Sequence, residues 1–207
     1  MSKPDRSIDP RIMERAKKEF LTHGFEKASL KAICQEAGVT TGALYKRYKG
    51  KEDLFCAVVS DTVAALDAFV EMRSSAQARD LSDEELVSAW EMGESMLEWF
   101  RFLYEYHDGF TMLISCAGGT RYANFQHDLT EKMTAKTYEY FQEAKTRGLA
   151  HGDISMEEMH ILLSAFWTTV CEPFIHGYTW DQLEVHSDLI CSLFDWNRAL
   201  GFHTSVI

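Results

Sequence analysis

The apolar residues of this chain recur mostly at intervals of three and four residues, which predicts α-helices in almost every segment. The first apolar stripe, with four-residue spacing, consists of Ile12, Ala16 and Phe20. It lies between Asp9, which with the following proline is typical of a helix start, and Gly24, which is typical of a helix end. Runs that alternate between apolar and polar residues are scarce, so strands are not expected.

Two short helices and one long helix are predicted next. Ser29 is placed to cap a helix over 30–37, and Thr40 is placed to cap a helix over 41–48. The long helix begins near residue 51 and carries an apolar stripe to about residue 69. The first 50 residues therefore predict three helices.

The remainder of the chain predicts further helices, over 82–107, 122–147, 156–174 and 179–200. Ser155, with Glu158 three residues later, forms a capping-box pattern. Pro173 lacks an N–H group, so we expect it to kink or end its helix near residue 172. The pattern predicts an all-α fold of about nine helices, with domains over 1–50 and 51–207.

Charge is divided unevenly between these two parts. The whole chain has a formal net charge of −11. Residues 1–51 hold 12 Lys and Arg against 6 Asp and Glu, a charge of +6, whereas residues 52–207 hold 9 against 26, a charge of −17. Such asymmetry suggests that the basic part binds a polyanion. A solvated charged surface is the alternative, and charge alone does not separate the two.

Composition narrows the class of protein further. The apolar fraction of 46% and charged fraction of 26% are ordinary for a globular protein. No run of about 18 apolar residues predicts a membrane span, and the N-terminus lacks the apolar region of a secretion signal. Five widely spaced cysteines without a CxxC pair predict neither a disulfide framework nor a zinc site. We therefore expect a cytoplasmic protein without metal or cofactor.

The second and third helices have the pattern of a helix-turn-helix, whose second helix enters the DNA major groove. Gly38 is suited to the tight turn between them. Ile33, Val39 and Leu44 can fill the space beneath the crossing. The third helix then offers hydroxyl, small and basic side chains, which are the groups that contact phosphates and base edges.

The residues from about 12 to 55 resemble the N-terminal domain of the TetR family of bacterial transcriptional repressors. The resemblance rests on fixed spacing of Ile33, Ala37, Gly38, Val39, Thr40, Gly42, Leu44, Tyr45, Tyr48, Lys51, Glu52 and Leu54, extended upstream by Phe20, Gly24 and Phe25. Cys34 departs from the alanine that is usual in the family, but a small apolar side chain still fits there. The resemblance implies an all-helical homodimer with a DNA-binding head and a larger ligand-binding body.

Carried over position by position, the resemblance implies DNA contacts at Lys31, Thr40, Thr41, Gly42, Tyr45, Lys46, Tyr48 and Lys51. Packing in the core is the competing interpretation for Tyr48, and a solvated surface is the competing interpretation for Lys31. For Arg47 the sequence does not decide between a contact with DNA and a structural role. We expect the protein to bind a palindromic operator and to be released from it by a small effector. The sequence does not distinguish repression from activation.

The resemblance gives no residue-level match for the body, so the ligand contacts expected there rest on size and amphipathic character alone. They are Trp99, Tyr106, Phe110, Phe125, Phe166 and Trp167, which predict an apolar or aromatic effector of unknown identity. The last two helices are expected to form the dimer interface. The residues Met156, Met159, Leu162, Leu163, Phe166 and Val170 provide more apolar surface than one core needs.

Two other classes of function compete with a DNA-binding regulator. A helical protein-interaction module would explain the acidic body but not the basic head. A metal-dependent helical-bundle enzyme would need two E-x-x-H pairs, and the chain holds one, at 157–160. The chain has no P-loop, GxGxxG or GxSxG motif, and we expect that it is not an enzyme.

Overall fold

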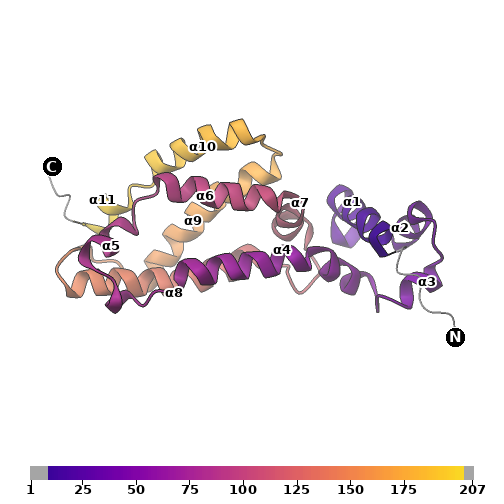
Figure 1. Ribbon diagram of the computed structural model, residues 1–207, viewed down its shortest axis with the longest axis horizontal. Helices are drawn as coiled ribbons and strands as arrows, with labels where there is room; N and C mark the ends of the chain where they lie inside the picture. The colour runs from indigo at the N-terminus through magenta and orange to yellow at the C-terminus, as the bar shows by residue number, and fades with distance from the viewer. Residues whose placement is uncertain (1–8, 203–207) are drawn as a thin grey trace. The chain divides into compact units, whose positions relative to one another are not determined.

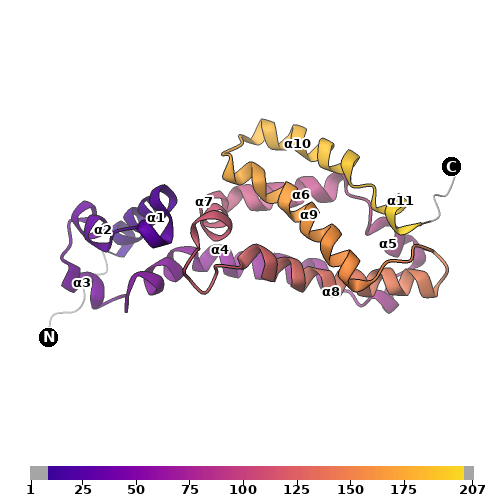
Figure 2. The ribbon, with the colours of Figure 1, turned by 180° about the vertical axis from the view of Figure 1, so that it is seen from behind.

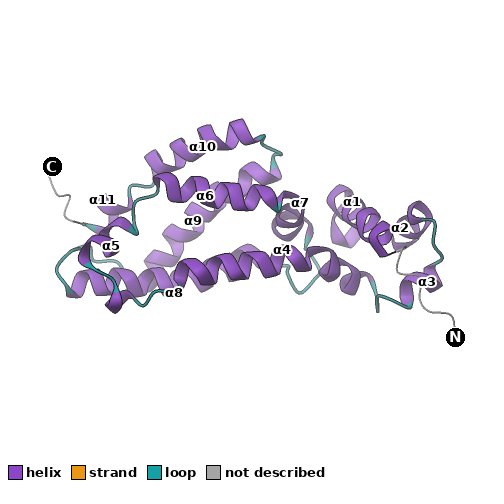
Figure 3. Ribbon diagram, viewed as in Figure 1, coloured by secondary structure: helices purple, strands orange, loops and turns teal. Residues whose placement is uncertain are grey.

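A computed structural model describes residues 9–202 of the protein (Figure 1). Over these residues every regular element is a helix, and a single bridge pairs Ala150 with Phe202 in place of a strand (Figure 3). The all-α prediction is therefore confirmed. None of the helices in this range is long and apolar enough to cross a membrane.

The chain forms two compact units. The first contains the residues up to Asp67 together with Tyr106–Phe125, and the second contains Ala68–Glu105 together with the residues from Gln126 onward. The expected division at residue 50 stays a prediction. Each unit is described below by itself.

The first unit is built from six helical segments. They are α1 (Asp9–Lys27), α2 (Leu30–Ala37), α3 (Thr41–Tyr45), the first part of α4 (Lys51–Ser74), α7 (His107–Thr111) and a π-helical turn, Met112–Cys116. Its core joins the predicted stripe of α1 to the start of α4 and to the π-helical turn. The rings of Phe20 and Phe55 meet edge to face with centroids 5.0 Å apart. Burial of each such ring contributes roughly 2 kcal/mol.

The ends of the first helices follow the predicted signals closely. Gly24 interrupts α1 with a φ of 68° and a ψ of 166°, and helical geometry resumes for one short turn to Lys27. The Ser29 hydroxyl accepts a hydrogen bond from the Ala32 N–H, so α2 begins where expected. The third helix is shorter than predicted, because regular α-helix ends at Tyr45 and the next residues continue as a turn.

The second unit is a bundle of helices. It holds the end of α4, a short 3-10 turn (Ala78–Asp80), α5 (Asp83–Ser88), α6 (Gly93–Glu105), α8 (Phe125–Thr146) from Gln126 on, α9 (Met156–Ile175), α10 (Trp180–Leu193) and α11 (Trp196–Leu200). The two views agree that α6 and α10 lie side by side and that α9 runs obliquely between α6 and α8 (Figures 1 and 2).

Two helices that the sequence predicted as continuous are each split in two. The helix expected over 82–107 breaks after Ser88, where the chain turns and the buried ring of Trp90 packs against Phe141 and Phe202. The helix expected over 179–200 breaks near residue 194. There the Asp195 carboxylate accepts a hydrogen bond from the Arg198 N–H and caps a new helix.

Of the two expected effects of Pro173, a kink or an end, the end is wrong, because α9 continues to Ile175, and the kink stays a prediction. A proline inside a helix leaves the carbonyl four residues earlier without its usual donor. In this helix that carbonyl belongs to Thr169, and Nε2 of His186 lies 2.9 Å from its oxygen. A side chain of α10 therefore replaces the missing backbone hydrogen bond, which allows the helix to continue.

Candidate nucleic-acid interface and effector cavity

The turn between α2 and α3 has the geometry that the sequence predicted. Gly38 adopts a left-handed conformation, with a φ of 67° and a ψ of 37°, which glycine adopts at little cost. The Val39 N–H donates to the Cys34 carbonyl at 2.9 Å. The hydroxyl of Thr40 accepts from the Ala43 N–H at 3.1 Å, which fixes the first turn of α3.

Apolar side chains hold the two helices together from below. Ile33 and Leu44 are buried, and Val39 packs against the same core. Cys34 is buried as well, and burial raises the pKa of its thiol, which therefore stays neutral. The cysteine thus packs as a small apolar residue, as expected.

Most of the expected DNA contacts lie on the surface of this helix pair. Those that are exposed are Lys31, Thr40, Thr41, Gly42, Tyr45 and Lys46. The side chain of Tyr45 is 58% exposed, although the adjacent Leu44 is fully buried. The short helix α3 therefore buries one residue and leaves hydroxyl, aromatic and basic groups in solvent, which suits a surface that meets a polyanion.

The other two expected contacts are engaged within the protein. The Tyr48 hydroxyl donates to the Met13 sulfur at 3.4 Å, and burial raises the pKa of Tyr48. The Lys51 ammonium donates to the carbonyl oxygens of Glu26 at 2.8 Å and Ala28 at 3.1 Å. It also lies over the Phe25 ring, at 4.8 Å from the centroid. Both side chains thus contact α1 or the residue just after it, and their contact with DNA stays a prediction.

Arg47, which the sequence left between two roles, ties the end of α3 to the start of α1. Its guanidinium forms an ion pair with Asp9 and donates to the Ala43 carbonyl at 3.1 Å. Only 16% of its side chain is exposed. These contacts favour a structural role for Arg47.

The second unit contains a cavity of about 560 Å³. Its lining comes from the end of α4, from the stretch over residues 81–99 that includes α5 and the start of α6, and from parts of α8, α9 and α11. Of the six expected ligand residues, Trp99 and Phe166 line it. Trp167 lies behind them, buried against Trp99 with ring centroids 5.0 Å apart.

The remaining expected ligand residues belong to the first unit. Phe110 is fully buried there, Phe125 packs against the core of that unit, and Tyr106 is half-buried. The structure therefore does not bring these three residues to the cavity of the second unit, and their role as ligand contacts stays a prediction.

Several cavity residues were missed by reasoning from sequence. The aromatic ones are Trp90, Tyr140 and Trp196, and the basic ones are Arg73, Lys132 and Lys136. Lys132, Lys136 and Tyr140 recur every four residues on α8, whereas Arg73, Trp90 and Trp196 come from separate parts of the chain. One signal was available in the sequence, because basic residues are rare in the acidic body and two of them stand four apart, at 132 and 136.

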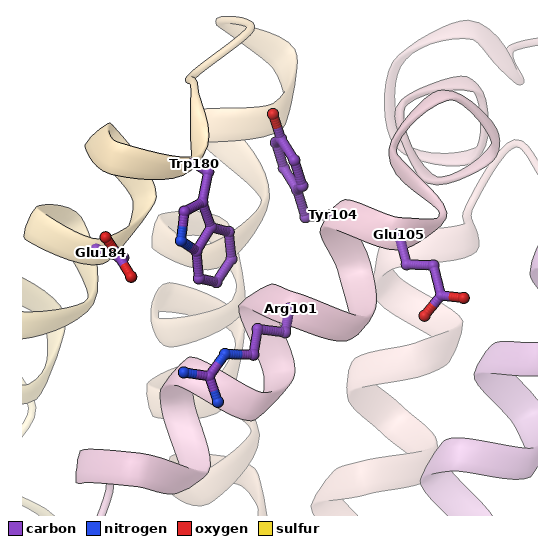
Figure 4. Close-up of a pocket in the computed structure, with 5 residues that line it drawn as sticks. All are labelled: Arg101, Tyr104, Glu105, Trp180 and Glu184. Carbon is purple, nitrogen blue, oxygen red and sulfur yellow. The ribbon is translucent and has the colours of Figure 1, made fainter.

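A second, shallower hollow of about 330 Å³ lies between α6 and α10. Tyr104 and Trp180 contribute rings with centroids 5.7 Å apart. Figure 4 shows Arg101 below Trp180, whereas the Glu105 side chain points away from both. The hollow is wide open to solvent and has few side chains around it, so it is a weaker candidate for a small-molecule site than the cavity.

Comparison with known proteins supports the interpretation of the head. Residues 12–58 match the family model described as bacterial regulatory proteins, tetR family. This match covers the head of the chain, which is similar there to regulators of the tetR family. The regulator UidR of Escherichia coli K12 is 35% identical over 79 residues, which are 38% of this chain and 40% of UidR. The chain thus matches less than half of the length of this curated relative.

Solved structures extend the similarity of fold over nearly the whole chain. A TetR-like regulator from Rhodococcus sp. RHA1 has a TM-score of 0.57 and 19% identity, and the match covers 93% of this chain and 96% of that regulator. A TetR-family regulator from Streptomyces coelicolor A3 has a TM-score of 0.59 and 16% identity, covering 93% and 91%. Identities this low establish the fold alone. The matched family model and the curated relative are both described as regulators.

Proposed function

We propose that this protein is a transcriptional regulator that binds a palindromic DNA operator as a dimer, represses transcription and is released by a small effector. The observation that carries this proposal is the exposed surface of α3, where Thr41, Tyr45 and Lys46 surround a fully buried Leu44. The positive charge of residues 1–51, set against an acidic remainder, supports binding of a polyanion at this surface.

Binding of duplex DNA tests the proposal directly. An operator would be selected from random duplexes, and its affinity measured by fluorescence anisotropy over a range of salt concentrations. The logarithm of the binding constant is expected to fall with the logarithm of salt concentration, with a slope of about −0.9 per phosphate neutralised. A selected site without two-fold symmetry, or an affinity independent of salt, would contradict the proposal.

Single substitutions locate the surface that binds DNA. Tyr45→Ala and Lys46→Gln are each expected to weaken operator binding by about 1–3 kcal/mol while leaving unfolding unchanged, because both side chains are exposed. Lys145→Gln is the matched control, since it removes one positive charge from the second unit. If Tyr45→Ala and Lys46→Gln both bind like the parent protein, the assignment of α3 to the major groove is wrong.

We infer a dimer that pairs α9 and α10 with their symmetry mates. Of the apolar residues expected there, Met159, Leu163 and Val170 are buried within their own unit. Other large apolar side chains on these two helices are 63% exposed or more, namely Ile161, Val185, Leu189 and Leu193. Exposed apolar surface of this kind supports an interface between copies.

Sedimentation measures this association. Leu189→Glu is expected to shift the protein from dimer to monomer, because it places a charge on the exposed apolar face of α10. Met72→Glu, an equally exposed apolar position on α4, is the control and is expected to leave the dimer intact. A parent protein that sediments as a monomer at micromolar concentration would refute the interface.

From the sequence we propose two domains: a DNA-binding domain over residues 1–50 and an effector-binding and dimerisation domain over 51–207. The cavity of the second unit supports the assignment of effector binding to the later residues, because it is large enough for a small molecule. Effector release is tested by adding candidate ligands to the operator complex and following the loss of anisotropy.

A further inference from the structure

Among the charged residues that line the cavity of the second unit, basic ones outnumber acidic ones, whereas the unit as a whole is acidic. The residues of this unit, 68–105 and 126–207, include 8 Lys and Arg against 21 Asp and Glu. The cavity lining includes three of those basic residues, Arg73, Lys132 and Lys136, but only two acidic ones, Glu85 and Glu91. Positive charge is therefore concentrated at the cavity, although the unit as a whole is strongly negative.

One of the two acidic residues is already committed to a helix start. The Glu85 carboxylate accepts hydrogen bonds from the N–H group of Ser82 at 2.7 Å and from its hydroxyl at 2.8 Å. These bonds complete the capping box of α5, and they lower the pKa of Glu85. Glu85 thus has less capacity to accept hydrogen bonds from a ligand than an unengaged carboxylate would have.

The cationic side of the lining comes from α4 and α8. Lys132 and Lys136 are one turn apart on α8 and so share a face of that helix. The Lys136 ammonium lies 5.2 Å from the centroid of the Tyr140 ring, and the Tyr140 hydroxyl donates to the Ala76 carbonyl at 2.9 Å. This hydrogen bond holds α8 against the segment that follows α4.

Arg73 and Lys136 each form an ion pair that still allows them to interact with an anion. Lys136 pairs with Glu139 at 3.1 Å on the surface, where such pairs are weak. Arg73 donates to Glu98 at 2.8 Å, and its guanidinium lies over the rings of Phe69 and Trp99. These two carboxylates offset part of the positive charge, but neither Glu98 nor Glu139 belongs to the lining, where three basic residues stand against two acidic ones.

The rest of the lining is mostly apolar, with one unused hydrogen-bond donor. Trp90, Trp99, Phe166 and Trp196 contribute aromatic rings, and three methionines contribute polarizable side chains. Trp90 is only 7% exposed, and its indole N–H has no acceptor among the described residues. A buried donor of this kind is satisfied when a ligand supplies an acceptor.

We propose that the cavity binds an organic acid in which a carboxylate is joined to an alkyl or aromatic body. The apolar body lies among the aromatic and methionine side chains, and the carboxylate is held by the positive charge of Lys132, Lys136 and Arg73. The volume of about 560 Å³ suits a ligand of this class. The inference rests on the proposed function in so far as the acid is the effector of the regulator.

The test compares three probes that share one apolar body and differ in charge: decanoate, decanamide and decylammonium. Binding to the purified full-length protein, without DNA, is followed by titration calorimetry and by quenching of tryptophan fluorescence, since three tryptophans line the cavity. Decanoate is expected to bind at least tenfold more tightly than decanamide, and decylammonium more weakly than both. The preference for decanoate is expected to decrease as salt is added.

Variants identify the groups responsible for this preference. The double variant Lys132→Gln and Lys136→Gln is expected to lose at least tenfold in affinity for decanoate but to keep its affinity for decanamide. Lys145→Gln, on the same helix but outside the lining, is the control and is expected to bind like the parent. Trp90→Phe retains a ring without the N–H donor and is expected to weaken the binding of both decanoate and decanamide.

Three results would overturn the inference: equal affinity for decanoate and decanamide, a preference for decylammonium, or no binding of any probe. Because the titrations contain no DNA, these results are separate from a failure of the proposed function. If decanoate binds as expected but does not release the operator, the site is an acid-binding site, and only its link to regulation is refuted.

Discussion

Replacing Gly109 with alanine is expected to destabilise the first unit, because α7 packs directly on α4 at this glycine. A Cβ atom at position 109 would overlap Oγ1 of Thr62 and would lie 2.8 Å from the Cβ of that residue. Both residues are buried, and favourable contacts between carbon atoms need about 3.5–4.0 Å. The side chain of Thr62 must rotate or α7 must move away.

The size of the effect follows from two opposing contributions. Alanine is favoured over glycine inside a helix by about 1 kcal/mol. Forcing an extra carbon into a packed contact costs roughly 1–3 kcal/mol, and an overlap as large as this one belongs at the upper end of that range. The net expectation is a loss of about 2 kcal/mol in the free energy of unfolding of the first unit.

Urea unfolding measured by hydrogen exchange of peptides from α4 and α7 reports on this unit specifically. Gly93→Ala, at a helical glycine where an added Cβ meets no atom within 4 Å, is the control and should be neutral or slightly stabilising. Thr62→Ala in the Gly109→Ala background should recover part of the loss, because it removes Oγ1 but retains Cβ. Unchanged stability of Gly109→Ala, or no recovery in the double variant, would refute the packing argument.

Three further predictions concern a salt bridge, a helix cap and a thiol. The Lys17 ammonium donates to the Asp108 carboxylate at 2.6 Å and holds the pKa of that carboxyl below its usual value. Asp108 therefore stabilises the fold above about pH 3.9, the usual pKa of an aspartate in the unfolded chain. This stabilisation is lost as the pH falls through the folded pKa. Asp108→Asn should therefore cost less than about 1 kcal/mol at neutral pH and nothing in strong acid, as measured by unfolding across pH. Thr40→Ala should lower the stability of the first unit by about 1 kcal/mol in urea, because it removes the cap of α3, and a stability equal to the parent would contradict this role. Burial raises the pKa of Cys171 to about 12. Iodoacetamide should therefore leave Cys171 unmodified at about pH 8 in the native protein and modify it after unfolding. Rapid labelling of the native protein, detected by mass spectrometry, would contradict the burial of this thiol.

The elements of the head could be predicted from the sequence because their ends are determined locally. Ser29, Gly38 and Thr40 each act through a hydrogen bond or a backbone angle that involves only a few neighbouring residues. The same holds for Ser155, which accepts from the Glu158 N–H and begins α9 as expected. Such signals depend little on the rest of the fold.

The elements of the body were harder to predict because distant contacts determine where they end. Where Pro173 leaves the Thr169 carbonyl without a backbone donor, the partner is His186, a residue of the next helix. The break after Ser88 places Trp90 against Phe141 and Phe202, which are far away in sequence. Apolar periodicity alone cannot reveal such partners.

The candidate sites show the same contrast. The exposed residues of α3 could be selected by spacing, since one short helix carries them. Lys51 illustrates the limit, because its hydrogen bonds to two carbonyl oxygens at the end of α1 and just after it are visible only in three dimensions. The cavity gathers residues from helices that are far apart in sequence, and of the aromatic residues chosen for it only Trp99 and Phe166 line it.

The membership of Tyr106–Phe125 in the first unit has a consequence for protein engineering. Met112, Leu113, Cys116 and Ala117 belong to the same buried cluster as Phe20 and Phe55, yet they follow in sequence after a long stretch of the second unit. A fragment that stops at residue 67 would expose the apolar surface that these residues cover. A chimaera that exchanges the head of this protein for another should therefore replace residues 106–125 together with the head, or rebuild their contacts in the recipient.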